Sequence, residues 1–309
     1  MIKSDDKSDN FERRLVRMFN AVPHTVSLGL SILKFDLENR SAAVSLPFRT
    51  PCTRDMSGSA IEWAAVTSLI DTACSLAVCT AVRRNALFAT IDLSVERALP
   101  ILAKRDIVAN AMVSELENEI AILSASASHP DGDRPLAIAR AGFFVPQSIE
   151  PSALVTDHVD SSHERTAALL KDWFIDMNSV PSSKYFAYLG MRSLKKGGER
   201  AIWLPFRSDF TGNQFSGAIH GGVLASLLEH AAQDYSGAFR HNVACPPLGV
   251  DIDFLRPAGP ADLFAACTSA ISDEEYSEVN VEAWQTSRLQ PVARAMFKFA
   301  HRKVPADAR

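Results

Sequence analysis

The sequence repeats itself once, and this repeat restricts the fold more than any other feature does. Leu-Pro-Phe-Arg at 46–49 recurs at 204–207, and Val-Pro at 22–23 recurs at 180–181, both at an offset of 158 residues. The 309 residues are enough for two units of about 150, each large enough to bury a core. We therefore predict an N-terminal domain at 1–145, a linker at 146–162 and a homologous C-terminal domain at 163–309.

The same register continues into the rest of each half. The offset of 158 aligns 58–66 with 216–224 and places Asp71 opposite Glu229. Farther along, one inserted residue and then a short deletion restore the match, so the duplication runs through the whole of each half. The matched pairs there are Asp92 with Asp251, Arg97 with Arg256, Arg140 with Arg294 and Phe143 with Phe297.

Both halves predict the same order of elements. A charged amphipathic helix opens each half, two strands lead to the shared Leu-Pro-Phe-Arg, one long apolar helix follows, and a meander of strands ends the half. His-Pro-Asp-Gly-Asp at 129–133 marks a turn in the first meander. We predict the opening helices at 10–20 and 161–178, the long helices at 60–83 and 221–239, and the strands that follow them at 89–95 and 249–255.

The two long helices are apolar nearly all round, and this decides the fold class. Only four side chains between 219 and 232 are polar, and a helix of this kind is expected to be surrounded by protein. An antiparallel sheet wrapped around the helix meets that need, and two such units can cover each other's open edges by pairing side by side. The predicted class is α+β, with two such units in tandem.

Composition excludes several classes of protein. The net charge of −4 argues against nucleic acid as the main partner, although a local basic patch for a phosphorylated ligand stays possible. No stretch reaches about eighteen consecutive apolar residues, and residues 1–14 are polar, so we expect neither a membrane span nor a secretory signal. The five cysteines show no disulfide or metal spacing. We expect a cytoplasmic protein with reduced thiols, a small ligand, and no metal or cofactor.

Each long helix carries one carboxylate among apolar neighbours, at matched positions: Asp71 and Glu229. An ionised carboxylate buried without partners is costly, so it needs dedicated donors or a wet cleft. One interpretation is a structural acid at the seam between helices, and the other is a functional acid in a cleft. The duplication at matched positions favours the cleft.

The second long helix begins with Ile-His-Gly-Gly-Val at 219–223. Glycines at this point allow a ligand carbonyl to approach the backbone, and the free N–H groups of the first helical turn point at it. The alternative is an ordinary loop-to-helix junction in which His220 is a cap. Because a carboxylate follows eight residues after Gly221, we favour an oxyanion-binding site.

These residues resemble a known family. Gln214, the His-Gly-Gly at 220–222 and Glu229 look like the hotdog thioesterases of the phenylacetyl-CoA and 4-hydroxybenzoyl-CoA branches. The resemblance covers the chain as two hotdog domains, and it is specific in the second half and degenerate in the first. In this family an Asn or Gln fifteen residues before the acid orients the thioester. That position is Gln214, with Asn213 beside it, and which amide serves stays open.

The resemblance also implies which residues share a site. In the family, the glycine at the helix start polarises the thioester carbonyl and the acid comes from the partner's helix, which here is the other half. The working site would combine Gln214, His220 and Gly221 with Asp71. Ser75, one turn beyond Asp71, would help to hold a water molecule. The implied activity is that of an intracellular acyl-CoA thioesterase.

The reciprocal site would pair Glu229 with Glu-Trp-Ala at 62–64. This triplet departs from His-Gly-Gly, because Trp63 is bulky at the carbonyl-binding position and Glu62 would repel an oxyanion. We therefore predict one working site per chain, with Glu229 vestigial or structural.

The reaction follows from these parts. The Gly221 N–H would stabilise the developing oxyanion, while Asp71 would either attack the carbonyl to form a mixed anhydride or activate water. Both routes stay open. His220 is better interpreted as a residue that positions the glycines than as a base. The CoA phosphates need cations, for which the candidates, each equally well a solvated surface charge, are Arg83, Arg84, Arg97 and Arg256.

Two other functions stay open as alternatives. One is a non-catalytic acyl-CoA binder or sensor that uses the same cleft, and the other is a hotdog dehydratase or hydratase, whose upstream His-Phe-Pro-Gly loop is missing here. Trp63, Phe215 and Phe254 are candidates for the acyl pocket, although aromatic residues more often belong to the core. A homo-oligomer of the tandem unit is possible through the outer faces.

Overall fold

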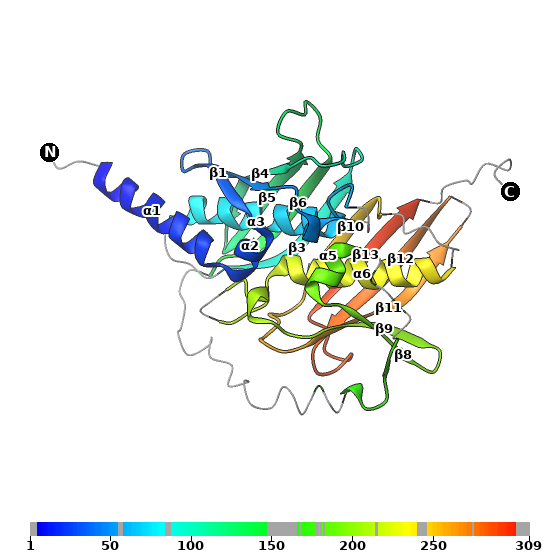
Figure 1. Cartoon of the computed structure of the whole chain (residues 1–309). Coiled ribbons are helices and arrows are strands. Elements are labelled where there is room, and N and C mark those ends of the chain that lie inside the picture. The colour runs from blue at the N-terminus through cyan, green and yellow to red at the C-terminus, as the bar shows by residue number, and fades with distance from the viewer. Residues whose placement is uncertain are drawn as a thin grey trace.

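The computed structural model describes residues 5–54, 58–83, 88–146, 166, 169–176, 179, 181, 183–213, 216–239, 246–273 and 275–300, with the side chains of all but 5–9 and 236–239. It consists of two halves joined through one continuous sheet (Figure 1). In each half a long helix packs against the antiparallel sheet of that half. The predicted α+β class with two such units in tandem is confirmed.

The helices and strands follow one another in nearly the same order in both halves. The first half contains α1 (Asp5–Ala21), α2 (Pro23–Leu28), β1 (Ser31–Asp36), β2 (Ser41–Leu46), η1 (Thr50–Cys52), α3 (Trp63–Val82), β3 (Ala89–Arg97), β4 (Ile107–Glu117), β5 (Ile120–Ser128) and β6 (Ala137–Phe144). The second half contains β7 (Phe174–Ile175), α5 (Lys184–Leu189), β8 (Arg192–Lys196), β9 (Glu199–Leu204), η3 (Ser208–Phe210), α6 (Gly221–Phe239), β10 (Gly249–Phe254), β11 (Leu263–Ser272), β12 (Tyr276–Trp284) and β13 (Ala293–Ala300).

All these strands belong to one sheet, in the order β1-β2-β4-β5-β6-β3-β10-β13-β12-β11-β9-β8-β7. The halves meet where β3 and β10 pair antiparallel, and Leu93 lies opposite Ile252. The offset that aligns Asp92 with Asp251 also aligns these two residues with each other, so the pair lies on a pseudo-two-fold axis. Each half thereby covers the open sheet edge of the other.

The long helices α3 and α6 lie side by side next to this axis, cyan and yellow in Figure 1. By length and composition α3 is apolar enough to cross a membrane, but most of it is buried inside the protein, as expected for a core helix. Buried residues of both helices and both halves of the sheet form one hydrophobic cluster. The two halves therefore share a core, and residues of one half can reach the helix of the other.

The repeated Leu-Pro-Phe-Arg has a structural role in both halves. Arg49 donates a hydrogen bond from Nη1 to the carbonyl oxygen of Ser27 in α2, at 3.1 Å. Arg207 donates from Nη1 to the carbonyl oxygen of Tyr188 in α5, at 2.8 Å. Each arginine thus fixes the short helix of its own half to the end of a strand. The tetrapeptide marks a duplicated brace and not a catalytic motif.

Two of the sequence-based predictions are wrong. The first is the extent of the helix at 161–178: residues 166, 169 and 170 are helical, but Phe174–Ile175 form strand β7, which pairs with β8. The helical pattern there loses to edge pairing by two residues with high strand preference. The linker predicted at 146–162 lies outside the described residues, apart from Pro146.

The second wrong prediction is the match of Val-Pro at 22–23 with 180–181. Helix α2 begins at Pro23 but α5 begins at Lys184, and each ends before a glycine with positive φ, Gly29 or Gly190. The difference between these two glycines gives an offset of 161 for the short helices (190 − 29). The second half therefore has three residues fewer before its Leu-Pro-Phe-Arg, and dipeptide matching could not detect this.

Candidate active site

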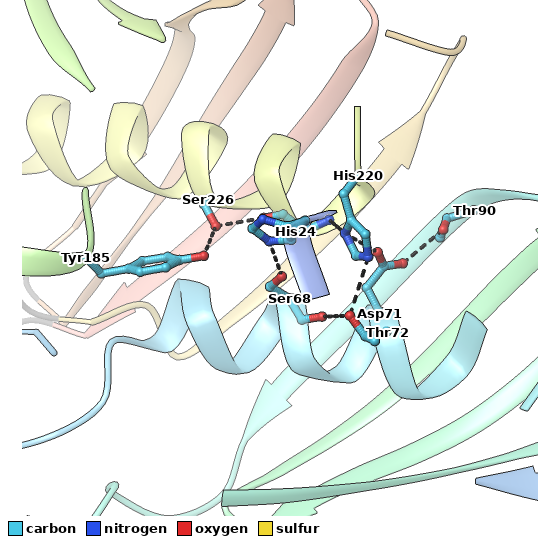
Figure 2. A network of polar contacts seen from close by, with 9 residues as sticks. His24, Ser68, Asp71, Thr72, Thr90, Tyr185, His220 and Ser226 are labelled. Carbon is cyan, nitrogen blue, oxygen red and sulfur yellow. Dashed lines mark hydrogen bonds and ion pairs between the residues drawn. The ribbon is translucent and has the colours of Figure 1, made fainter. Parts of the chain in front are cut away.

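Polar side chains from both halves lie close together at the start of α6 (Figure 2). Gly221 is the first residue of this helix, and a Cβ atom placed on it would lie 2.9 Å from Oδ2 of Asp71 in α3. The Nδ1 atom of His220 lies 3.3 Å from the same oxygen. Asp71 is 2% exposed and His220 is 8% exposed. The structure thus brings together three residues that the sequence predicted for one site, with the acid contributed by the other half.

The backbone N–H of Gly221 is free to bind a ligand. Within the described part of the chain it donates to no protein acceptor, whereas the next amide, that of Gly222, donates to Nδ1 of His220 at 3.0 Å. The first amides of a helix lack partners within the helix and point along its dipole toward negative charge. Because Gly221 has no side chain, a carbonyl oxygen can approach this amide.

The neighbours of His220 determine where its proton lies. Since Nδ1 accepts from Gly222, the proton of the neutral ring is on Nε2, which lies 3.4 Å from Oγ1 of Thr72. The Thr72 hydroxyl donates in turn to the carbonyl oxygen of Ser68 at 2.8 Å. Burial lowers the pKa of His220, although Asp71 acts in the opposite direction. A neutral His220 therefore caps the helix start and leaves Asp71 available as a base or nucleophile.

Thr90, near the start of β3, holds the other oxygen of Asp71. Its hydroxyl donates to Oδ1 at 2.9 Å, and its side chain is half-buried. The sequence analysis missed this residue. The available signal was a hydroxyl near the start of the predicted strand at 89–95, and periodicity alone does not relate that position to a helix in the same half.

His24 and Ser68 extend the polar network away from the reacting groups (Figure 2). His24 is fully buried in α2, and its Nε2 lies 3.0 Å from Oγ of Ser68 in α3. Its ring centroid is 4.9 Å from that of His220. Sequence reasoning missed both residues. A histidine next to the Val-Pro at 22–23 was the visible signal, and the mistaken alignment of that dipeptide hid its equivalence to Tyr185.

The corresponding place at the start of α3 is closed. Glu62 accepts a hydrogen bond from the N–H of Trp63 at 2.9 Å, so the amide equivalent to that of Gly221 is already used. The Trp63 side chain is 3% exposed, and the Arg97 guanidinium lies 3.8 Å from the centre of its ring. Arg97 also donates to the carbonyl oxygen of Pro247. A substrate carbonyl finds neither a donor nor space here.

Glu229, the counterpart of Asp71, has the contacts of a structural acid. It is 2% exposed and accepts from Nε2 of Gln233 at 3.0 Å. Burial, followed by the neighbouring Glu62, raises the pKa of Glu229 to about 8, and burial also raises the pKa of Glu62. A protonated Glu229 does not serve as a nucleophile or base at neutral pH.

The hydroxyl next to Asp71 is also absent from the reciprocal site. Thr90 pairs with Phe143 on β6, and Val250 pairs with Phe297 on β13. Phe143 and Phe297 are counterparts in the duplication, and β3 has a register shift between Thr90 and Asp92 that β10 lacks, so Val250 and not Gly249 occupies the position of Thr90. The two sites therefore differ in their donor, their acid and the group that holds the acid.

Of the remaining predicted catalytic residues, the structure describes Asn213 and Ser75. Asn213 accepts from the N–H of Ser216 at 3.2 Å and shapes the turn before α6. Gln214 lies outside the described residues, so the choice between the two amides stays open. Ser75 is half-buried one turn beyond Asp71 on α3.

The arginines predicted for CoA binding differ in their surroundings. Arg83 is exposed and donates to the carbonyl oxygen of Leu37 at 2.5 Å, and Arg84 lies outside the described residues. Arg97 is occupied with Trp63, as described above. Arg256 is exposed just after β10, and the duplication makes it the counterpart of Arg97.

The three aromatic candidates for the acyl pocket also differ in their surroundings. Trp63 is a buried plug in the reciprocal site, as shown by its exposure and its contact with Arg97. Phe254 is half-buried and packs against the shared core. Phe215 lies outside the described residues. The four cysteines in the described ranges, Cys52, Cys74, Cys79 and Cys267, are free thiols, and Cys245 lies outside them.

Comparison with known proteins agrees with this architecture. A family model described as the acyl-CoA thioesterase N-terminal domain matches residues 211–300, which include all of α6 and β10 to β13. The crystal structure of a candidate thioesterase from Novosphingobium aromaticivorans DSM 12444 covers 88% of this chain and 98% of its own, with a TM-score of 0.61 and 11% identity. The chain is a tandem hotdog protein. It resembles the tandem hotdog acyl-CoA thioesterases, as its motifs predicted.

Two further structures support the fold of this tandem hotdog protein. The tesB protein of Mycobacterium avium subs paratuberculosis covers 90% of the chain and 98% of its own, with a TM-score of 0.56 and 12% identity. A conserved protein with a hot dog fold from Alicyclobacillus acidocaldarius covers 93% and 98%, with a TM-score of 0.55 and 13% identity. No curated protein matches the sequence. At such identities the structural likeness establishes the fold and leaves the reaction to the residues of the site.

Proposed function

We propose that this protein hydrolyses acyl-CoA thioesters to a free acid and CoA, at one working site per chain. The observation that carries the proposal is a buried carboxylate beside a free helix-start amide, each contributed by a different half. Asp71 and Gly221 are these groups, and their proximity is set by the packing of α3 against α6. Thioester hydrolysis needs both an activated nucleophile and a donor for the oxyanion. The match of 211–300 to a thioesterase family model adds support.

In the proposed reaction the thioester carbonyl oxygen accepts a hydrogen bond from the Gly221 N–H. One donor of this kind typically contributes roughly 3 kcal/mol to stabilising the transition state. Asp71 then either removes a proton from an attacking water or attacks the carbonyl itself. Thr90 donates to Asp71 through its hydrogen, so its lone pairs can accept from the water, and this contact favours the water route. The CoA sulfur leaves as a thiolate. On the water route this thiolate takes up the proton that Asp71 removed, and on the nucleophilic route a water molecule then hydrolyses the mixed anhydride to the free acid and regenerates Asp71.

Arg256 is the cation that we propose for the phosphates of CoA at this site. It is exposed, so it can reach a solvated phosphate, and its counterpart Arg97 lies over the residue equivalent to Gly221. A phosphate contact of this kind would weaken with salt. We expect Arg256→Gln to raise KM severalfold with little change in kcat, and to reduce the dependence of KM on ionic strength.

A panel of acyl-CoA thioesters tests the proposed function. The purified protein is incubated with short, medium, long and aromatic acyl-CoA substrates, and release of the free thiol is followed with a thiol reagent. We expect saturable turnover of at least one substrate. Asp71→Asn is the matched control, because it keeps the size of the side chain and removes its charge.

Saturable binding of acyl-CoA without release of the thiol would support the alternative function, an acyl-CoA binder or sensor. Binding is measured by calorimetry with a thioether analogue, in which the reactive bond cannot break. If neither binding nor turnover occurs across the panel, the proposed substrate class is wrong.

A further inference from the structure

His24 is the most deeply buried histidine beside the site, and the proposed reaction does not use it directly. Its side chain is 0% exposed, and Nδ1 has no hydrogen-bond partner among the described residues. Leaving a buried polar atom without a partner destabilises the folded state. An apolar side chain would fill the same space without leaving a polar atom unpaired. We therefore expect the imidazole to have a role beyond filling space.

The side chain and the backbone N–H of His24 both make contacts that lead to the start of α6, while its carbonyl oxygen accepts from Oγ of Ser27 in its own helix. Nε2 of His24 lies 3.0 Å from Oγ of Ser68, and a Cβ on Gly222 would lie 2.1 Å from that oxygen, so α3 lies very close to α6 at Ser68. The backbone N–H of His24 donates to the carbonyl oxygen of Thr211 at 3.5 Å. The next residue, Gly212, is pressed against His220, because a Cβ there would lie 2.7 Å from the His220 Cα. His24 thereby fixes both sides of the helix start.

The duplication provides an internal comparison. The offset of 161 for the short helices makes Tyr185 the counterpart of His24, and the offset of 158 for the long helices makes Ser226 the counterpart of Ser68. Tyr185 and Ser226 form the matching buried contact, at 3.2 Å between their oxygens. A phenol is therefore sufficient to join a short helix to the seam. The imidazole occurs in the half where its ring lies against His220.

A charged His220 would disable the proposed site. Protonation of Nδ1 would break the hydrogen bond from Gly222 and would turn the 3.3 Å contact with Asp71 into an ion pair. The groups around the His220 ring are Asp71 and Thr72 from α3 and His24 from α2, with Arg207 also acting on His24. Burial, His220 and Arg207 all lower the pKa of His24, so it presents a neutral ring to its neighbour.

We infer that His24 is a positioning residue: its neutral imidazole packs against His220, excludes water from that ring and holds it in the form that caps Gly222 and leaves Asp71 free. This inference rests on the proposed function for its effect on turnover, but its effect on His220 does not. The residue acts through His220 and Ser68 and does not touch the substrate.

Three variants test this inference. His24→Asn is too short to reach Ser68 and admits water beside His220, whereas His24→Gln keeps an amide at about the reach of Nε2. Tyr185→Phe is the matched control, because it removes the counterpart hydrogen bond. Ser226 also donates to the carbonyl oxygen of Gly222 at 2.7 Å, so this control probes the same helical turn without touching either imidazole.

The first measurement is the pH dependence of kcat/KM on the best acyl-CoA substrate. For His24→Asn we expect kcat to fall about tenfold and the acid limb to move to higher pH, because a hydrated His220 protonates more easily. His24→Gln should recover part of kcat. Tyr185→Phe should lower thermal stability and keep kcat within about twofold. Equal losses of stability in His24→Asn and Tyr185→Phe, with normal kcat and an unchanged acid limb in both, would overturn the inference.

The second measurement does not depend on activity. In protein labelled with ¹⁵N-histidine, the signals of His220 are identified by their loss in His220→Gln. We expect His220 to titrate at higher pH in His24→Asn than in the native protein, and to be unchanged in Tyr185→Phe. An unchanged His220 in both His24→Asn and His24→Gln would contradict the inference. If the native protein turns over no acyl-CoA, the proposed function fails, and this measurement still decides the role of His24.

Discussion

The starts of α3 and α6 occupy equivalent places in the two halves, but their first backbone amides differ in their partners. At α6 the first amide is free and has a glycine beside it, while His220 caps the second amide. At α3 the first amide is capped by Glu62, and the indole of Trp63 fills the space. The cap that satisfies the first amide of α3 stabilises the helix and occupies the donor, whereas the first amide of α6 keeps its donor available for a ligand.

The difference extends to the acids. Asp71 has a threonine hydroxyl on one oxygen and the helix start beside the other. Glu229 faces a second buried acid, Glu62, and its pKa is raised. Both halves keep the hydrogen bond from the arginine of Leu-Pro-Phe-Arg to the short helix. Both also keep the contact between the short helix and a serine of the long helix, Ser68 or Ser226. The two halves thus share the contacts that hold the fold and differ in the groups around their buried acids.

The largest expected effect comes from the acid of the working site. Asp71→Asn removes the anion and keeps the hydrogen bond that Thr90 can donate. We expect kcat to fall about a hundredfold or more, in line with the loss of a positioned base or nucleophile. Affinity for a non-hydrolysable acyl-CoA analogue, measured by calorimetry, should stay within a few fold. A variant that loses binding to the same extent as turnover would indicate that Asp71 acts in substrate binding instead.

The next effect concerns the free amide. Gly221→Ala places a methyl group 2.9 Å from Oδ2 of Asp71, so the carboxylate must move or the carbonyl must stay farther away. We expect a fall in kcat of roughly ten- to a hundredfold with a small change in stability, because alanine suits a helix start without strain. Steady-state kinetics and thermal unfolding check the two parts. Trp63→Phe, a change in the closed site, is the control and should leave kcat unaltered.

Thr90→Val replaces the hydroxyl that donates to Asp71 with the side chain found at the equivalent position, Val250, in the other half. The carboxylate then loses a hydrogen bond to a hydroxyl, a contact that typically contributes 1.5–3 kcal/mol when one group is charged. We expect kcat to fall roughly tenfold. Thr90→Ser, which keeps the hydroxyl, should recover most of the activity. Equal kcat values for the valine and serine variants would exclude a role for this hydrogen bond.

The smallest expected effect lies in the reciprocal site and depends on pH. The pKa of Glu229 is about 8 in the folded protein, above its ordinary value of 4.5. The folded state then binds more protons than the unfolded state, so the contribution of Glu229 to stability is complete below about pH 4.5 and is lost as the pH rises through about 8. We expect Glu229→Gln to raise the free energy of unfolding at pH 8 by about 1–3 kcal/mol, and by less at pH 5. Denaturant unfolding at both pH values provides the test.

Most of the fold could be predicted because the relevant signals repeat. Helix α6 was predicted with its observed bounds, since an apolar run with a glycine start leaves little choice. The predicted edge-to-edge pairing of the two units is confirmed, but the sequence did not show that β3 and β10 are the strands that pair. Strand β7 was missed, because two residues at a sheet edge carry too little pattern, and the offset of the short helices depended on a loop length that dipeptide matching does not reveal.

The sequence predicted those site residues whose positions are related by the repeat or by spacing along the chain. Asp71, His220 and Gly221 were placed together through the duplication and the resemblance, and the structure brings them into contact. Thr90 and His24 were not predicted, because Thr90 reaches Asp71 from a strand and His24 reaches Ser68 and His220 from a short helix. Such contacts are set by how a helix rotates against its sheet, and no spacing along the chain encodes this.

The central claim is that one of the two equivalent acids works and the other does not. The most direct test is the ratio of kcat between Glu229→Gln and Asp71→Asn, measured for both purified variants on the same acyl-CoA at pH 7 and normalised to folded protein. We predict that Glu229→Gln keeps kcat within a few fold of the native value, so that the ratio is about fifty or more. A ratio below one, with Glu229→Gln inactive and Asp71→Asn nearly normal, would place the reaction in the site that Trp63 fills and would contradict this account.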